Sequence, residues 1–115
     1  MEELVIFTRT YDLLRWLLPR CENFPKSQRF VLTARLQDAV LDFQETIVMA
    51  NARRGRERLT DLQSADGHLN KVRLYLRIAH EESWLSSGQY VHVSRMVHEI
   101  GALLGGWIKQ TSRQK

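Results

Sequence analysis

Hydrophobic residues recur at alternating steps of three and four along four segments, which is the spacing that lines one face of an α-helix. The segments cover about residues 3–20, 25–53, 57–82 and 87–110. Four amphipathic helices joined by short breaks predict an all-α, antiparallel up-down-up-down four-helix bundle. In chain order, the predicted core stripes are Phe7, Tyr11, Leu14 and Leu18, widened by Leu13 and Leu17; Leu36, Val40, Phe43, Ile47 and Ala50; Leu62, Leu69, Val72, Leu76 and Ala79; and Tyr90, Val93, Val97, Ile100, Leu104 and Trp107.

Prolines and serines mark the breaks between these segments. Pro19, followed by a polar stretch, ends the first helix near Arg20. Pro25 suits the first turn of a helix, so the second helix is expected to begin there. Ser86 and Ser87 are both suitable N-caps for the fourth helix. These signals predict one domain spanning residues 1–115.

Composition narrows the class of protein. The 115 residues are 43% hydrophobic and 26% charged, as in ordinary globular domains. The single cysteine, Cys21, allows no intrachain disulfide and fits a reducing compartment. The acidic start at Glu2 and Glu3 is unlike a secretory signal, and the uncharged run 100–108 is about half a membrane span. We therefore expect a soluble cytoplasmic protein that makes no membrane contact.

Two surfaces predict self-association. The second helix carries another apolar stripe, displaced by roughly 100° from its core stripe. The fourth helix is rich in small residues, and each mid-helix glycine costs about 1 kcal/mol relative to alanine unless a second backbone packs closely there. The alternative is that Gly105 and Gly106 only loosen the helix end. The second stripe is Phe30, Ala34, Leu41 and Val48, the small residues are Gly101, Ala102, Gly105 and Gly106, and the predicted interface is Phe30, Ala34, Leu41, Gly101 and Gly105.

Catalytic and metal-binding patterns are missing from the sequence. The histidines His68, His80, His92 and His98 include no i, i+4 pair and no His-Glu-x-x-His motif. No Glu-x-x-His pair indicates a di-iron site, no glycine-rich loop indicates a phosphate cradle, and no serine has a glycine elbow. The acidic residues of the second helix are typical of a solvated, ion-paired surface. We therefore expect no enzyme activity, metal or cofactor.

Basic residues gather at both ends of the predicted bundle, and the chain has a net charge of +4. Such clusters can neutralise nucleic-acid phosphates without reading sequence. The structural alternative is that these cations complement helix C-termini. One end would hold Arg53, Arg54, Arg56, Arg58, Lys109, Arg113 and Lys115 against Glu2, Glu3 and Glu57; the opposite end would hold Arg20, Lys26, Arg29, Arg73 and Arg77, with Glu81 and Glu82 available to pair with Arg77.

Four motifs in order make the sequence resemble the accessory proteins (Avd) of diversity-generating retroelements. They are Tyr11-Asp12-Leu13-Leu14; Phe24-Pro25-Lys26-Ser27-Gln28-Arg29-Phe30; Ala65-Asp66-x-x-Leu69-x-x-x-Arg73-x-x-Leu76-Arg77; and Ile100-Gly101-x-Leu103-Leu104-Gly105-Gly106-Trp107-Ile108. The bundle proteins encoded by intervening sequences of bacterial ribosomal RNA genes share this architecture and are the main confusable relatives.

The resemblance implies a non-enzymatic subunit that assembles into a cyclic pentamer and binds the element's reverse transcriptase together with RNA or cDNA. It favours the motif cations Lys26, Arg29, Arg73 and Arg77 as binding residues, while the 53–58 loop matches no family motif. Two roles remain open for Asp66, which are an ion pair with Arg73 and a contact with another subunit. The alternative function is a stand-alone oligomeric bundle that binds ribosomal RNA or is purely structural.

Overall fold

The computed structural model describes residues 2–113, with side chains from Val5 to Arg113. Over this range the chain forms four α-helices and one short 3-10 helix, with no strand. The α-helices are α1 (Glu2–Cys21), α2 (Leu32–Ala52), α3 (Gly55–Glu81) and α4 (Ser87–Arg113), and the 3-10 helix is η1 (Lys26–Gln28). The prediction of an all-α four-helix fold is confirmed.

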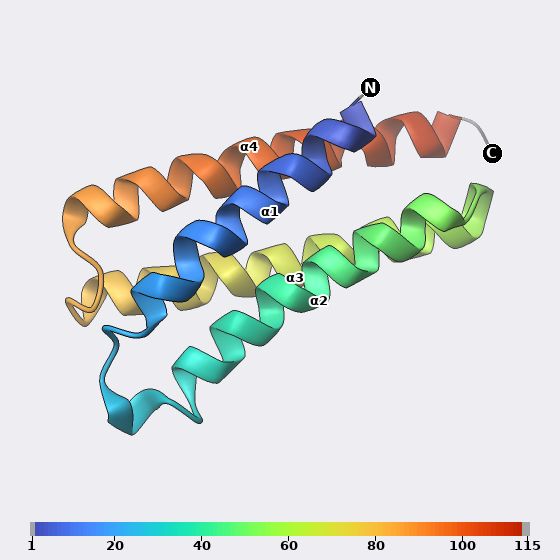
Figure 1. Ribbon diagram of the computed structural model, residues 1–115. Helices are drawn as coiled ribbons and strands as arrows, with labels where there is room; N and C mark the ends of the chain where they lie inside the picture. Colours follow the sequence, from blue (N-terminus) through green and yellow to red (C-terminus); the bar gives the residue numbers. More distant parts are fainter. Residues whose placement is uncertain (1, 114–115) are drawn as a thin grey trace.

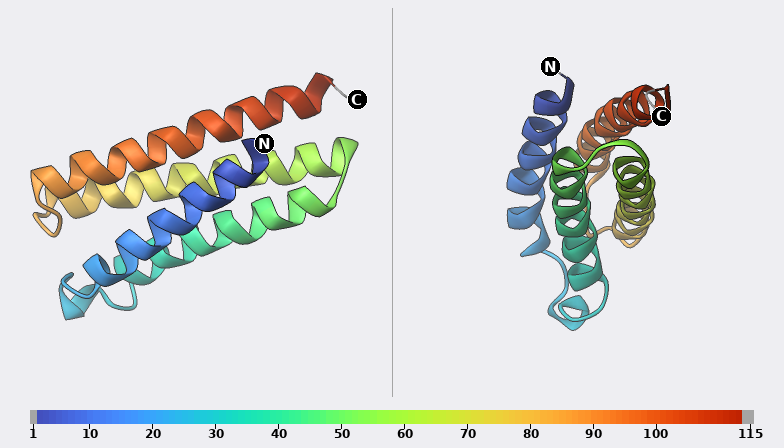
Figure 2. Two further views of the ribbon diagram at one scale, coloured as in Figure 1. Left: turned by 45° about the horizontal axis from the view of Figure 1, so that its top comes forward. Right: turned by 90° about the vertical axis from the view of Figure 1, so that its right-hand side faces the viewer.

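Successive helices run antiparallel, with α1 and α4 in one layer and α2 and α3 in the other (Figure 1). Packing joins α2 to α3, α3 to α4, and α1 to both α4 and α2, whereas α2 and α4 lie diagonally opposite without contact. One end, here called the linker end, holds the α1–α2 linker and the α3–α4 turn. The other, here called the arginine end, holds the start of α1, the α2–α3 turn and the end of α4 (Figure 2).

The core follows the predicted stripes in three of the four helices. Every predicted core residue of α2 and α3 is buried, and so are those of α4 except the half-buried Tyr90. In α1 the prediction was wrong in detail, because Tyr11 and Leu18 are exposed. The buried face of α1 instead includes Ile6 and Thr10. The Thr10 hydroxyl donates to the Ile6 carbonyl at 2.7 Å, which satisfies a polar group at a core position.

The second helix begins later than predicted. Pro25 precedes only the single turn of η1, and α2 begins at Leu32. Val31, at φ −117° and ψ −97°, separates the two elements. The break allows both Phe24 and Leu32 to be buried at the linker end, which an unbroken helix from Pro25 would not arrange. As a result Phe30 lies in the linker and is 85% exposed, so it is not part of an α2 stripe.

The start of α4 agrees with the serine signal. Ser86 Oγ accepts from the Gln89 N–H at 3.1 Å, and Gln89 Oε1 accepts from the Ser86 N–H at 2.9 Å. This reciprocal pair is a capping box, which satisfies two N–H groups that the helix itself cannot. None of the helices in the described range is long and apolar enough to cross a membrane.

Candidate nucleic-acid and partner interface

At the arginine end, Arg58 closes the end of α2. Its Nε donates to the Ala50 carbonyl at 2.9 Å, and its Nη2 donates to the Asn51 carbonyl at 3.2 Å. The guanidinium also lies 5.7 Å from the centre of the Trp107 ring of α4. A cation at this position complements the negative end of the α2 dipole and joins three helices. Arg58 therefore acts as the structural alternative predicts.

The other cations of the α2–α3 turn divide into two kinds. Arg53 Nη1 donates to both carboxylate oxygens of Asp61, at 3.2 and 3.3 Å. The side chains of Arg54 and Arg56 are exposed and have no hydrogen-bond or ion-pair partner among the described residues. Lys109 and Arg113 are exposed on the last turns of α4, while Lys115 and the side chains of Glu2 and Glu3 lie outside the described residues. Of the four arginines of this turn, Arg53 and Arg58 thus form contacts within the fold.

Arg73, the first of the two motif arginines of α3, lies on the side of that helix that faces α4. Arg73 Nη1 donates to Asn70 Oδ1 at 2.7 Å, rather than pairing with Asp66. A side chain at Gly101 of α4 would collide with the Arg73 guanidinium, so the glycine makes room for this arginine. Two motifs that are far apart in sequence therefore meet across one helix pair.

Arg77 lies one turn further along α3 and remains largely free. Its Nε is 3.4 Å from Glu81 Oε1, with both side chains more than half exposed, so the predicted pairing exists but contributes little to stability. Nearby, the His80 ring stacks on Tyr90 at 4.3 Å and an interplanar angle of 2°. The His80 Nε2 is 3.5 Å from Ser87 Oγ. These ring and hydroxyl contacts fix the α4 side of the groove.

Arg73 lines a hollow of about 240 Å³ between α3 and α4, which also includes Leu76 and Val97. An open surface of α4, which includes Val91 and Arg95, continues from this hollow. The hollow and this surface share Tyr90, Ser94 and His98. We call this surface, with Arg77, the α3–α4 groove. It combines cations, hydroxyls and an aromatic ring on two rigid helices.

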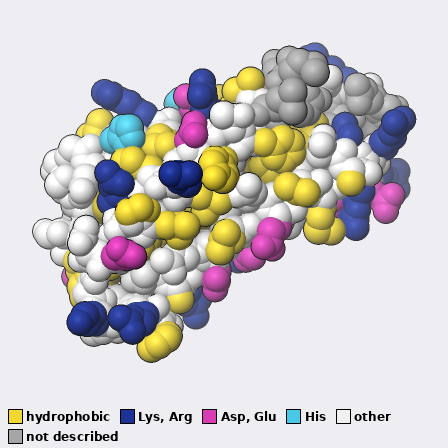
Figure 3. Space-filling model, viewed as in Figure 1, with side chains coloured by type: hydrophobic (Ala, Val, Ile, Leu, Met, Phe, Trp, Pro, Cys, Tyr) yellow, Lys and Arg dark blue, Asp and Glu magenta, His cyan; other side chains and the backbone are white. Residues whose placement is uncertain are grey.

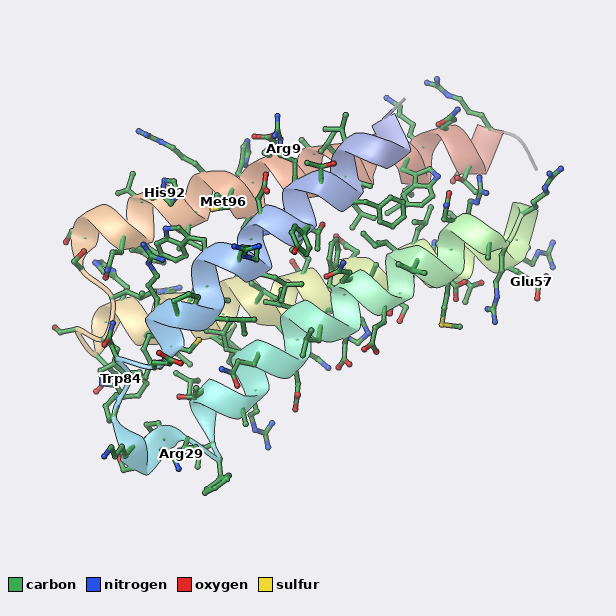
Figure 4. The ribbon with its side chains drawn as sticks, viewed as in Figure 1. Arg9, Arg29, Glu57, Trp84, His92 and Met96 are labelled. Carbon is green, nitrogen blue, oxygen red and sulfur yellow. The ribbon has the colours of Figure 1, made fainter. Side chains whose placement is uncertain are left out.

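Lys26 and Arg29 do not join this groove, contrary to the expectation that one end of the bundle would gather all five cations. They line a separate hollow at the linker end with Cys21 and Thr33, which shares no residue with the hollow beside Arg73 (Figure 4). Arg20 is apart from both, since its Nη1 donates to the Trp16 carbonyl and its guanidinium lies 4.7 Å from the Trp16 ring centre. The prediction took no account of the side of each helix, and Arg73 packs against Gly101 at the middle of α4 rather than at its linker end.

The predicted self-association surfaces lie on opposite sides of the bundle. Leu41 and Val48 are exposed on α2, and Ala34 is half-buried. Acidic and hydrophobic side chains lie next to one another along the lower side of the molecule in Figure 3. Gly105 is exposed on α4, and a side chain there would meet nothing within 4 Å. Gly101 differs from Gly105, because it already packs against α3 within the same chain.

Three groove residues, Tyr90, Ser94 and His98, were not identified as site residues from the sequence. They occur every four residues along α4, which puts them on one helix face beside Gly101. That spacing was the available signal, but it became informative only once Arg73 was seen to pack against the same face. Within the described part of the chain, no group of three His, Cys, Asp or Glu side chains is arranged to hold a metal ion.

Comparison with known proteins places the chain among four-helix proteins. A family model described as bAvd-like matches residues 4–111. A crystal structure of a protein of unknown function from the S23 ribosomal protein family of Bacteroides thetaiotaomicron superposes with a TM-score of 0.85. That protein is 18% identical, over 95% of this chain and 99% of its own, which shows a shared fold. No curated protein matches the sequence.

The family match runs through all four helices and includes each of the motifs that contribute Arg73, Arg77 and Gly101 to the groove. Only a few residues at each end lie outside it. The chain therefore belongs to the bAvd-like family and is an Avd-type accessory protein.

Proposed function

We propose that this protein is a non-enzymatic subunit of a diversity-generating retroelement, which binds the element's reverse transcriptase and its RNA or cDNA. The family match over residues 4–111 is the observation that supports this proposal. The protein's contribution is binding and positioning, while the reverse transcriptase performs the chemistry of mutagenic cDNA synthesis.

The α3–α4 groove is the proposed contact with the reverse transcriptase. Arg73 and Arg77 stand on a rigid helix, and rigid positions hold a contact at a smaller entropic cost than a loop does. Polymerases that handle nucleic acids are themselves basic, so net charge alone would not bring the two proteins together. The groove offers a shaped alternative, with Tyr90 and Val91 providing apolar area beside the two arginines.

Self-association completes the proposal. A ring requires two different surfaces on each subunit, because one must dock onto the other of the next copy. The outer face of α2 carries exposed Leu41 and Val48 among Asp38, Asp42 and Glu45. The diagonally opposite face of α4 presents Ala102 and Gly105 with Arg95, Lys109 and Arg113. An apolar, acidic face and a small-residue, basic face on opposite sides support head-to-tail closure, with a pentamer as the expected ring.

Nucleic-acid binding is proposed to be electrostatic and largely independent of sequence. The unpartnered cations at the two ends, Lys26 and Arg29 at one and Arg54 and Arg56 at the other, provide phosphate contacts. Affinity for an oligonucleotide should fall steeply as salt rises. Binding without salt dependence, or no binding at low salt, would contradict this part of the proposal.

The reverse-transcriptase contact is tested by the double variant Arg73→Glu, Arg77→Glu. It should keep its helicity and oligomer size but fail to co-purify with the reverse transcriptase encoded beside it, and cDNA synthesis should stop. The matched control is Arg54→Glu, Arg56→Glu, which changes the charge equally at the arginine end. That control should still co-purify with the reverse transcriptase.

Two results would overturn the assignment of this contact to the groove. One is normal cDNA synthesis by the Arg73, Arg77 variant, and the other is loss of co-purification in the control alone. Genomic context tests the function itself. A neighbouring reverse transcriptase gene with near-identical repeats is expected, whereas an insertion within a ribosomal RNA gene would favour the stand-alone bundle.

A further inference from the structure

The hollow at the linker end has a volume of about 380 Å³ and lies between the end of α1 and the start of α2. Its lining combines two cations, Lys26 and Arg29, with the side chains of Thr33 and Gln37. Cys21 and Phe24, both buried, belong to its inner wall. This is a half-open concave site rather than a flat basic patch, because residues of α1, the linker and α2 together line one volume.

The Thr33 hydroxyl is the most informative group in this hollow. Thr33 is only 7% exposed, and its Oγ1 has no hydrogen-bond partner among the residues that the structure describes. Thr10, Thr46 and Thr60 each donate to the carbonyl four residues earlier in their helices. For Thr33 that carbonyl belongs to Arg29, which precedes α2 and lies outside the helical ladder. Thr33 thus places a buried, unpartnered donor in the wall of the hollow, and buried donors normally have partners.

Charge at this corner favours an anion. The side chains of Lys26 and Arg29 have no hydrogen-bond or ion-pair partner within the described range. The N-cap residue of α2, Val31, provides no side-chain hydrogen bond, so the positive end of this 21-residue helix lacks a side-chain cap. Glu22 also lines the hollow and offsets one of the two positive charges. Two cations, a free hydroxyl and an uncapped helix start are the groups that bind phosphate.

We propose that this hollow binds a phosphate monoester, with the Thr33 hydroxyl donating to one phosphate oxygen and Lys26 and Arg29 neutralising its charge. A monoester has a single substituent, so its phosphate can enter a hollow that is closed on its inner side by Cys21 and Phe24. A phosphodiester within a strand carries a nucleoside on both sides and fits such a hollow poorly. The expected source is the 5′-phosphate end of a nucleic-acid strand, an assignment that rests on the proposed function, and a free mononucleotide or phosphate ion is the alternative source.

The test compares single-stranded DNA oligonucleotides that differ only in a 5′-phosphate or a 5′-hydroxyl, together with AMP and inorganic phosphate as separate probes. Fluorescence anisotropy should show about tenfold tighter binding of the phosphorylated strand, as expected for added charge-assisted hydrogen bonds. Thr33→Val should remove that preference. The variant should fold as well as the parent protein, because the hydroxyl it deletes is unpartnered.

Thr111→Val is the matched control. Thr111 is also buried with an unpartnered hydroxyl, but it lies near the end of α4 and does not line this hollow. It should leave the preference for the 5′-phosphate unchanged. A second variant, Lys26→Gln with Arg29→Gln, changes only exposed side chains and should reduce the ratio of the two affinities without affecting thermal stability.

Each outcome decides the proposal. If AMP or inorganic phosphate binds and Thr33→Val abolishes that binding, while the two strands bind alike, the site stands with a free phosphate compound as its ligand. Equal binding of both strands together with no binding of AMP or phosphate overturns the site but leaves salt-dependent nucleic-acid binding intact. If the parent protein binds neither oligonucleotide, the result would instead count against the proposed nucleic-acid function.

Discussion

The two ends of the bundle carry similar numbers of cations but use them differently. At the arginine end, Arg53 and Arg58 are bound to Asp61 and to two α2 carbonyls. At the linker end, Lys26 and Arg29 have no such partner within the described residues and line a hollow. Arg29 and Glu57, on opposite sides of Figure 4, mark the two ends. The number of cations at a surface therefore does not show how many of them can bind a ligand. The presence or absence of a partner for each cation does show this.

The polarity of one helix explains this difference. The C-terminus of α2 exposes carbonyl groups with negative partial charge, and these draw in Arg58 as a cap. The N-terminus of α2 exposes N–H groups with positive partial charge, which offer nothing for a cation to bind. At the C-terminal end of α2 the fold binds Arg58, while the side chains of Arg54 and Arg56 have no partner among the described residues. At its N-terminal end the helix offers no acceptor for a cation, so the side chains of Lys26 and Arg29 stay free for an external anion.

The largest expected effect that tests this comparison is the loss of stability in Arg58→Ala. Two charge-assisted hydrogen bonds to helix-end carbonyls and a contact with Trp107 are removed, so the free energy of unfolding should fall by about 2–3 kcal/mol. Arg56→Ala, two residues away and unpartnered, should change it by less than about 0.5 kcal/mol. Urea unfolding measures both. Equal effects would mean that the arginine end is as free as the linker end.

A smaller expected effect is the pH dependence of stability that arises from the thiol of Cys21, which lines the linker-end hollow. Burial raises the pKa of Cys21 from its ordinary value of 9.0 to about 11, against a smaller opposing effect of the hydrogen bond with Gln37. Below pH 9 the thiol is protonated in the folded and the unfolded chain alike. Between pH 9 and 11 only the unfolded chain loses the proton, so stability should fall by roughly 1.4 kcal/mol per pH unit.

Cys21→Ala isolates this contribution, because the other groups that titrate at high pH are the same in both proteins. The variant should be less stable near pH 7 owing to the lost packing, but its stability should decline less between pH 9 and 11. Urea unfolding at pH 8, 9, 10 and 11 gives the two slopes. Parallel slopes would mean that the cysteine is not held in an environment that excludes its charge.

The fold was predictable from the sequence because periodic apolar residues carry most of the packing information. The α2 and α3 stripes were correct since nearly every core position there is Leu, Ile, Val, Phe or Ala. In α1 the polar Thr10 occupies a core position, so the pattern of hydrophobic residues did not identify the buried face of this helix correctly. The start of α2 was misplaced because Pro25 suits both a 3-10 turn and an α-helix, and only the burial of Phe24 and Leu32 distinguishes them.

The candidate site was less predictable than the fold. The sequence identifies Arg73 and Lys26 as cations but not which neighbour each one faces, since that depends on the side of the helix as well as on its axial position. The unpartnered Thr33 hydroxyl could not be foreseen, because a threonine finds or lacks a partner according to the packing around it, as the contrast between Thr10 and Thr33 shows. The sequence pattern shows the type of each residue and its position along a helix. The packing of distant segments determines which neighbours it has and therefore what it can bind.

The tight turns at the two ends provide a third, weaker test. At the arginine end, Gly55 has φ +59°, a left-handed conformation that disfavours residues with a Cβ. Gly55→Ala should reduce the free energy of unfolding by about 1 kcal/mol through backbone strain, since a side chain there meets nothing within 4 Å. Gly88→Ala, in the first turn of α4 and also in open space, is the control and should not destabilise the protein. Thermal unfolding of both variants measures the difference.

The smallest effect has the opposite sign and lies at the linker end. Ser83 has φ +65°, a left-handed conformation at a position where helices usually end with glycine. Its N–H donates to the His80 carbonyl and the Trp84 N–H donates to the Ala79 carbonyl, the two bonds of a Schellman motif. Ser83→Gly relieves the Cβ strain but gives the unfolded chain more freedom, so a net gain of about 0.5 kcal/mol is expected. Ser86→Gly, which removes the hydroxyl of the α4 capping box, should lower stability instead. A destabilised Ser83→Gly variant would show that this turn tolerates serine without strain, and that the two ends differ in their turns as well as in their cations.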